Sequence, residues 1–183
     1  MRPRAGGPVA TDHVPLGHQH RIGLAQPDVG PDSGALTTPT SEQDKAEEAI
    51  RQAIADYVEV YNHVRTDPDA DVGTLGDVAA GELLQIELGF MEEWRAKGWR
   101  ATKGIQVKNV DVGTVVAKGK RKTVAVTYCV DSTGVDVLDR DGKSVVADDR
   151  KDHFPIEMTL EKAEDDPWLP VTRYRGGDAC DGM

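Results

Sequence analysis

The hydrophobic period changes partway along the chain, and this change limits the folds that are open to it. Between residues 46 and 64, apolar side chains recur every three or four positions, which is the spacing of one helix face. After Gly104 the period becomes two, as in "TVAVTYCVD", where Val124, Val126 and Val130 fall on one face of a strand. Helices grouped before strands predict an α+β fold, with the helices packed on one face of an antiparallel sheet.

The helical half contains clear start and stop signals. Ser41 with an acid three residues later predicts an N-cap, and we expect the first helix to stop near Arg65. A second helical region is predicted from about Thr74, interrupted at Gly81. It should end at Gly98, because glycine accepts the backbone conformation that follows a helix.

The second half predicts four to six strands. A phase shift in "IQVKNVDVGTVVA" indicates a bulge near Asn109. The stretch "VDVLDRDGKSVV" is typical of a hairpin with Asp-Gly at its turn. Alternation in "FPIEMTLEK" predicts a strand in which Pro155 marks an edge or a strand start, and "WLPVTRYR" is expected to be the last strand.

Composition divides the 183 residues into two parts. Residues 1–40 are rich in Pro, Gly, Thr and His without helical or strand periodicity, and we predict that they are disordered. Their three arginines balance three aspartates, so the net charge of −10 lies in residues 41–183, which we predict to be a single α+β domain. An acidic surface argues against nucleic acid and anionic lipid as partners, and its simplest consequence is solubility.

No stretch of the chain is typical of a membrane span or a signal peptide. Residues 1–40 lack the apolar core of a signal peptide, and no later apolar run is long enough to cross a bilayer. We therefore expect no direct membrane insertion by this sequence.

The element order and several motifs resemble the nuclear-transport-factor-2-like, or cystatin-like, superfamily, in particular its actinobacterial secreted proteins and lipoproteins. The likeness covers roughly residues 43–180 and lies in "AEEAIRQAIADYVEVYN", "AAGELL…EEWRAKGW", "VTYCVDSTGVDVLDRDGKSV" and "WLPVTRY…GDAC". The resemblance implies a strongly curved sheet that forms a cone with the helices and encloses a pocket. It implies no single function, because this fold hosts isomerases, cyclases, dehydratases and non-enzymatic modules.

The two cysteines, Cys129 and Cys180, have no CxxC spacing and no neighbouring histidine cluster. They are either a disulfide or two separate thiols, and the resemblance, which includes both positions, favours the disulfide. A disulfide implies an oxidising compartment. We therefore expect an extracellular or cell-envelope location, with the cytoplasm as the alternative.

Four residues are candidates for the cone's pocket: Tyr57, Trp94, Tyr128 and Asp131. A carboxylate in a dry pocket has a raised pKa and can act as acid or base. Tyr57 and Trp94 lie on apolar helix faces and are also typical core residues. Alternation places Tyr128 and Asp131 on opposite faces of one strand, so they cannot both line the pocket without a bulge.

The sequence indicates no metal site and no cofactor. Asp67, Asp69 and Asp71 begin like a calcium loop, but Val72 and Val78 occupy the positions where that loop requires Gly and Glu. An acidic loop between helices explains them. His13, His18 and His20 lack partner acids at useful spacing, and no glycine-rich phosphate-binding motif opens a helix.

We expect a non-catalytic cell-envelope or secreted module that binds a small apolar ligand or a protein partner. The alternative is a pocket enzyme of the isomerase, cyclase or dehydratase type, with a buried Asp or Tyr as general base. A deep pocket with a buried, unpaired carboxylate would favour the enzyme, whereas a pocket filled by Trp94, Phe90 and tyrosine side chains would favour the module. A homodimer packed through the open face of the sheet is a further expectation.

Overall fold

The first helix begins at a capping box. In the computed structural model, which describes residues 41–177 and 180, the Ser41 side chain accepts a hydrogen bond from the Asp44 N–H, and the Asp44 carboxylate accepts one from the Ser41 N–H. Two of the otherwise unpaired donors of a helix start are satisfied in this way. Helix α1 runs over Glu42–Thr66, as the sequence predicts. The predicted disorder of residues 1–40 lies outside the described residues.

The second helical region is divided at Gly81, as predicted. Gly81 has φ +59° and follows Ala80, whose N–H donates to Pro170 O on the last strand. Gly98 has φ +68° and follows the end of the last helix, as expected of a residue in this position. The helical elements after α1 are η1 (Val72–Thr74), α2 (Leu75–Val78) and α3 (Gly81–Ala96).

The strands form an open antiparallel sheet of five strands and a separate pair. The large sheet has the order β2-β4-β6-β7, and β3 pairs with β4 beside β2; β1 pairs with β5. The strands are β1 (Arg100–Ala101), β2 (Gln106–Val112), β3 (Val116–Lys118), β4 (Arg121–Asp131), β5 (Val137–Leu138), β6 (His153–Ala163) and β7 (Leu169–Arg175).

Two local predictions for the strands are confirmed. The register of β2 against β4 shifts between Lys108 and Asp111, and Asn109 has φ 53°, as expected of a bulge. The hairpin predicted for "VDVLDRDGKSVV" is present as a short one, with Gly142 at φ 77° in its turn. Its arms are joined by the Leu138–Ser144 bridge and by the hydrogen bond from Val145 N–H to Val137 O. The sequence did not reveal that β5 also pairs with β1.

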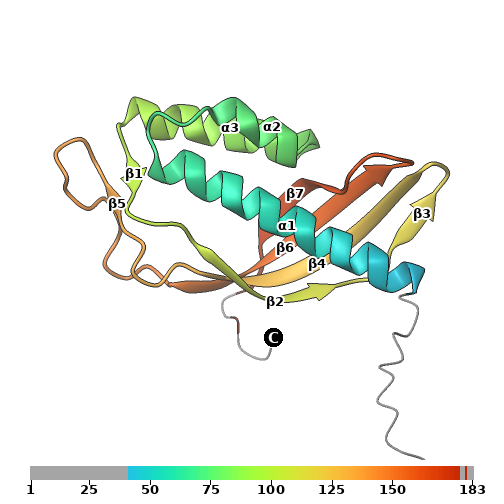
Figure 1. Ribbon diagram of the computed structural model, residues 1–183. Coiled ribbons are helices and arrows are strands. Elements are labelled where there is room, and N and C mark those ends of the chain that lie inside the picture. The colour runs from blue at the N-terminus through green and yellow to red at the C-terminus, as the bar shows by residue number, and fades with distance from the viewer. Residues whose placement is uncertain (1–40, 178–179, 181–183) are drawn as a thin grey trace, which may run out of the picture. The chain divides into compact units, whose positions relative to one another are not determined.

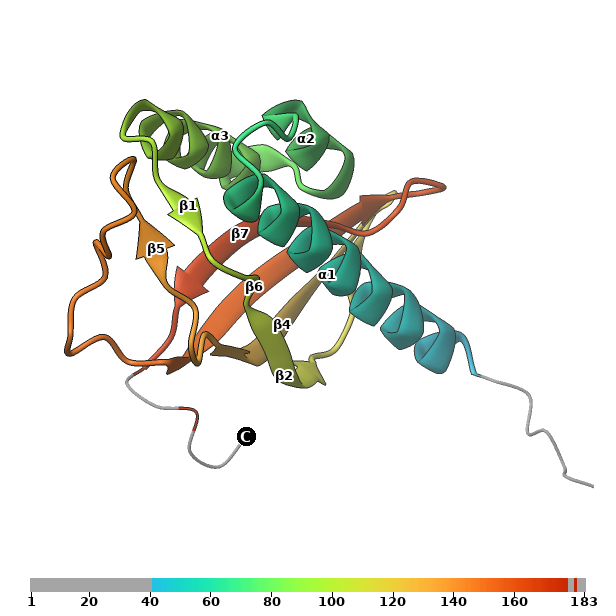
Figure 2. The same cartoon turned by 60° about the vertical axis from the view of Figure 1, so that its left-hand side comes forward.

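The helices cover one face of the curved sheet, which confirms the α+β prediction (Figures 1 and 2). Helix α1 crosses the concave face of the sheet. The core between the helix and the sheet consists of residues that the helical and strand periodicities predict to face inward. Its buried members include Ile50, Ile54, Tyr57, Tyr61, Val124, Val126, Tyr128, Ile156, Met158 and Leu160. A second cluster packs α3 and the end of α1 against the β1–β5 pair, and includes Val64, Leu75, Met91, Trp94, Ala101 and Val137.

No helix among the described residues has the length and apolar character needed to cross a membrane.

Candidate functional site

Three side chains from three elements meet inside the cone. Tyr57 of α1 donates its hydroxyl hydrogen to Glu87 Oε1 of α3, at 2.9 Å. Arg173 of β7 donates from Nη1 to the Tyr57 oxygen at 2.7 Å, and its Nη2 lies 2.8 Å from Glu87 Oε1. The carboxylate of Glu87 is 1% exposed, so this is an ion pair within the protein. We call these residues the Tyr57–Glu87–Arg173 network.

Tyrosine rings fill the space around this network. Tyr61 stacks on Tyr57 with 5.8 Å between ring centroids, and the Arg173 guanidinium lies 5.1 Å from the Tyr61 centroid. Tyr128 is buried in the same cluster. Burial raises the pKa of both Tyr57 and Tyr128, because an ionised phenol loses its hydration there. Both phenols therefore stay protonated at neutral pH, and neither is poised to act as a base.

The network does not provide the buried, unpaired carboxylate that would favour an enzyme. Its carboxylate is buried, but the Glu87 side chain is neutralised by Arg173 and accepts the Tyr57 hydroxyl. None of these three side chains lines either of the two clefts that are presented below. The tyrosine side chains around the network are buried, and the polar groups of Tyr57, Glu87 and Arg173 satisfy one another.

Asp131 lies outside the interior, so the structure does not support it as a pocket residue. It shares the sheet's outer face with Lys108, whose Nζ bonds its Oδ2, and His153 Nε2 lies 3.3 Å from its Oδ1. The hydrogen bond from Lys108, together with those from Thr133, holds the pKa of Asp131 well below its usual range. Tyr128 points inward, so the predicted opposition of the two residues is correct.

Trp94 is a core residue of the second cluster, and it does not fill the cone. It packs against Phe90 with 5.2 Å between ring centroids and edge-to-face against Trp99 at 5.7 Å, while the Arg65 guanidinium lies 4.7 Å from its centroid. Phe90 is 38% exposed. Of the side chains whose presence in the pocket would favour a module, the tyrosines lie in the first cluster, whereas Trp94 lies in the second.

The cysteines form a disulfide in the structure. Cys129 of β4 is bonded to Cys180, with 5.7 Å between their Cα atoms. Just after β7, the Gly176 N–H donates a hydrogen bond to Pro155 O near the start of β6. The disulfide bond joins Cys180 to β4. It is compatible with an extracellular location.

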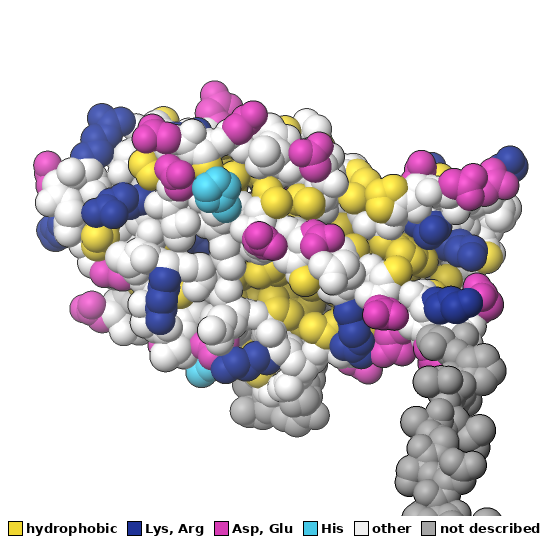
Figure 3. All heavy atoms as spheres, viewed as in Figure 1, with side chains coloured by type: hydrophobic (Ala, Val, Ile, Leu, Met, Phe, Trp, Pro, Cys, Tyr) yellow, Lys and Arg dark blue, Asp and Glu magenta, His cyan; other side chains and the backbone are white. Residues whose placement is uncertain are grey.

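One cleft lies between α1 and β2, and we call it the α1–β2 groove. Its volume is about 480 Å³, and its lining is mostly apolar: Ile54, Ala55, Val58, Val107 and Val110, with Arg51, Glu59 and Asn62. Two helix side chains fix its ends. Arg51 Nη1 donates to Val110 O, and the Asn62 amide exchanges two hydrogen bonds of 2.9 Å with the Ile105 backbone. Figure 3 shows the exposed hydrophobic surface between α1 and β2.

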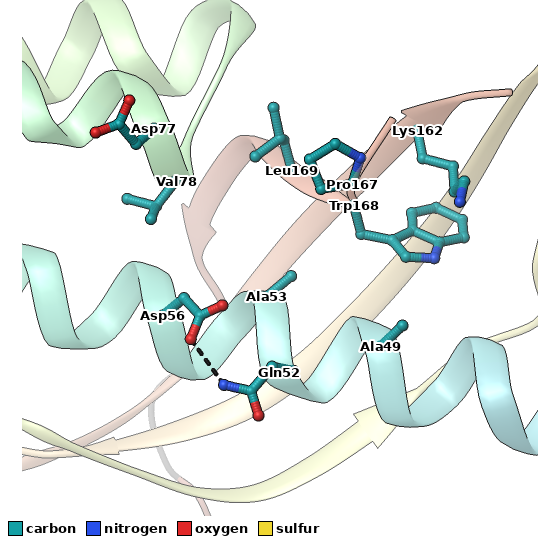
Figure 4. A pocket seen from close by; sticks show the side chains of 10 residues that line it. All are labelled: Ala49, Gln52, Ala53, Asp56, Asp77, Val78, Lys162, Pro167, Trp168 and Leu169. Atoms are coloured by element: carbon teal, nitrogen blue, oxygen red, sulfur yellow. Dashed lines mark hydrogen bonds between the residues drawn. The ribbon is translucent and has the colours of Figure 1, made fainter. Parts of the chain in front are cut away.

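A second cleft lies on the opposite flank of α1, and we call it the α1–turn pocket. Helix α2 and the β6–β7 turn form its other walls (Figure 4). Its volume is about 280 Å³. It is lined by Ala49, Gln52, Ala53, Asp56, Asp77, Val78, Lys162, Pro167, Trp168 and Leu169.

The aspartates of the loop after α1 form turn and capping hydrogen bonds, as expected of an acidic loop between helices. The Asp67 carboxylate accepts from the Asp69 N–H, and Asp71 caps η1 by accepting from the Gly73 N–H. Within residues 41–177 and 180, no group of three or more His, Cys, Asp or Glu side chains is arranged to hold a metal ion.

Sequence reasoning missed Glu87 and Arg173. The signal for Glu87 was its spacing, because it lies four residues after Leu83 and four before Met91 on the buried face of α3. For Arg173, the β7 register places it beside Met158 on the inward face of the sheet. A charged residue at an inward position predicts a buried partner of opposite charge.

Comparison with known proteins describes the fold and no more. The intermembrane space region of the chloroplast protein ARC6 matches with a TM-score of 0.52 at 14% identity, over 76% of this chain and all of that one. An NTF2-like superfamily protein from Salmonella enterica matches with a TM-score of 0.42 at 15% identity, over 77% of this chain and 96% of that one. An NTF2-like protein with a cystatin-like fold from Novosphingobium aromaticivorans gives 0.36 at 12% identity, over 80% and 94%.

Solved structures described as NTF2-like and cystatin-like are thus among the matches, with TM-scores below 0.5. No family model matches the sequence, and neither does any curated protein. The NTF2-like fold includes ligand-binding and enzymatic members, so the function has to be argued from the residues of this chain.

Proposed function

We propose that this protein is a non-catalytic binding module of the actinobacterial secreted or cell-envelope type, and that the α1–β2 groove binds a small apolar ligand. The observation that carries the proposal is the occupied cone interior. Tyr57, Glu87 and Arg173 satisfy one another there, which leaves the buried carboxylate without a free proton-transfer role.

The chemistry of the α1–β2 groove supports an apolar ligand. Its volume of about 480 Å³ falls within the range of small-molecule sites, which are mostly apolar with a few fixed polar groups. Val58, Val107 and Val110 supply the apolar wall. Arg51 and Asn62 are already engaged with the β2 backbone and nearby segments, so the groove keeps its width when a ligand enters.

The Cys129–Cys180 disulfide supports the proposed compartment, because disulfides persist where the redox environment is oxidising. Fractionation of the native host, with antibody detection, tests this half of the proposal. We expect the protein in the envelope or the medium. Confinement to the cytoplasm would contradict it.

The binding half is tested with N-phenyl-1-naphthylamine, a neutral dye that fluoresces in apolar sites. We expect saturable fluorescence with the wild-type protein and its loss in Ala55→Trp, which fills the groove from an exposed position. The matched control is Ala125→Trp, on the exposed outer face of β4. Equal binding by both variants, or NMR shifts centred on Tyr57 and Arg173, would overturn the assignment.

A further inference from the structure

The α1–turn pocket carries opposite charges at its two ends. Figure 4 shows Asp56 and Asp77 toward one end and Lys162 toward the other, with the apolar side chains of the pocket between them. Lys162 lies toward the Ala49 end of the helix. Asp56 follows Ala49 by seven residues, which is about 10 Å along a helix axis. The two charged ends are therefore well separated.

The acidic end is not neutralised within the described residues. Asp56 Oδ1 accepts a hydrogen bond of 2.7 Å from the Gln52 amide, but no described side chain donates to its Oδ2. Asp77 on α2 makes no ion pair with any residue of the described chain. The end formed by these carboxylates can therefore accept hydrogen bonds from a cation.

Lys162, which lines the basic end, has a second lysine as its cross-strand neighbour. Lys162 of β6 lies directly opposite Lys122 of β4 in the strand register, one step beyond the buried inward pair Leu160 and Val124. Both lysines therefore point to the pocket side of the sheet. Like charges directly opposite each other in a sheet are destabilising.

Neighbouring cations at this end of the sheet do have partners. Lys120 pairs with Glu164 at 2.8 Å, and Arg121 pairs with Glu161 at 2.6 Å. Lys122 and Lys162 form no ion pair with a described residue, although these acids are close in sequence. An anion placed beside the two lysines would remove their mutual repulsion.

The wall between the charged ends is apolar. Ala49 and Ala53 leave space beside the helix, and Trp168, Leu169 and Pro167 form the opposite side. A ligand that fits must have a cation and an anion about 10 Å apart, joined by an apolar body. That separation is too long for a single α-amino acid and matches an extended chain of about three residues.

We propose that the α1–turn pocket binds a short apolar peptide with both termini free. Its ammonium group faces Asp56 and Asp77, and its carboxylate faces Lys162 and Lys122. The inference goes beyond the proposed function, because it concerns a different flank of α1 and stands whether or not the α1–β2 groove binds an apolar ligand.

The test uses the tripeptide Ala-Leu-Ala and two forms of it that each lack one charge, the N-acetylated and the C-terminally amidated peptide. NMR titration of the full chain, with peptide up to about 10 mM, measures affinity and location together. We expect the free peptide to shift resonances of Ala53, Trp168 and Lys162. Each blocked form should bind about tenfold more weakly or worse, because it loses a charge-assisted hydrogen bond.

Two variants assign the ends. The Asp56→Asn variant should bind the free peptide no more tightly than the acetylated form. The Lys162→Met variant should bind the free peptide no more tightly than the amidated form. Ala49→Leu, which fills the pocket from an exposed position, should abolish binding. The matched controls are Asp111→Asn and Lys118→Met, on exposed strand positions outside the pocket.

The proposal would be overturned by no binding of the free peptide up to about 10 mM, by equal binding of all three peptides, or by equal losses in the control variants. Equal binding of the free and amidated peptides alone would also overturn it, because it would indicate a site for cations only. Shifts in Val58 and Val107 instead would place the peptide in the α1–β2 groove and would equally overturn the assignment.

Discussion

Arg173 on β7 and Glu87 on α3 form an ion pair of 2.8 Å inside the cone, and α1 joins them through the hydroxyl of Tyr57. The pair joins the last strand of the sheet to the helix that packs against it. Because the Glu87 carboxylate is almost fully buried, the contact bears directly on stability.

Breaking this pair from one side should destabilise the protein strongly. Arg173→Met leaves the 1% exposed carboxylate of Glu87 without a counter-charge, and we expect a loss of about 3 to 5 kcal/mol in the free energy of unfolding. Glu87→Gln should cost somewhat less, because the Arg173 side chain is 24% exposed and keeps some hydration. Urea unfolding at neutral pH measures both.

Replacing both partners should restore much of the loss. The double variant Glu87→Leu with Arg173→Met removes both charges and keeps a packed interior, and such exchanges are often neutral or stabilising. If the double variant were as unstable as the sum of the two single changes, the pair would not be the source of the effect.

The Tyr57 hydroxyl is expected to contribute to stability and to its alkaline pH dependence. Burial raises the pKa of Tyr57 above the value of about 10 for an unfolded tyrosine. The folded state therefore keeps its proton where the unfolded state loses it. The stabilisation is complete below about pH 10 and declines as the pH rises above it, by up to about 1.4 kcal/mol per pH unit for one phenol.

Tyr57→Phe separates these two effects. At neutral pH it removes the hydrogen bond to Glu87 and the one from Arg173, which should cost about 1 to 3 kcal/mol. Above pH 10 its stability should fall less steeply than that of the wild type, because Phe has no proton to lose. Tyr174→Phe, at a position 56% exposed, is the control. Equal alkaline slopes in all three proteins would refute the argument.

Much of the fold follows from sequence patterns, because they are local. The capping residues Ser41 and Asp44 predict where α1 begins, and the phase shift at Asn109 predicts the bulge in β2. The Asp-Gly dipeptide predicts the turn at Gly142, but turn residues do not reveal that β5 also pairs with a distant segment, β1. Partner choice between short strands is a tertiary property.

Less of the candidate site could be predicted from the sequence. Tyr57 and Tyr128 were predicted as pocket residues and are buried in the interior, but their neighbours Glu87 and Arg173 come from elements 30 and 116 residues away from Tyr57 in sequence. Asp131 was a candidate because a carboxylate in a dry pocket can act as acid or base, yet strand alternation places it on the outer face with Lys108. The clefts beside α1 depend on how the helix crosses the sheet, which no single segment encodes.

Asp131 should stabilise the protein at neutral pH and should lose this contribution at acid pH. Hydrogen bonds from Lys108 and Thr133 lower its pKa in the folded state, so it contributes stability above the unfolded value of about 4. This contribution is lost as the pH falls below that value toward the folded pKa. Asp131→Asn should therefore show a flatter acid limb in pH-dependent unfolding than the wild type or the Asp111→Asn control. An unchanged acid limb would show that the contact with Lys108 does not persist in solution.

The Cys129–Cys180 bond should be present in protein from an oxidising compartment and should stabilise it. Reduction should raise the mass by that of two hydrogen atoms and lower the free energy of unfolding by about 3 to 4 kcal/mol, because the bond closes a loop with a sequence separation of 51 residues. Cys180→Ser should lose a similar amount and show no further response to reductant. Its substitution site lies outside the core, whereas Cys129 is 4% exposed, so Cys129→Ser should cost more by burying a hydroxyl. A native mass that reductant leaves unchanged would remove both the bond and the main support for the proposed compartment.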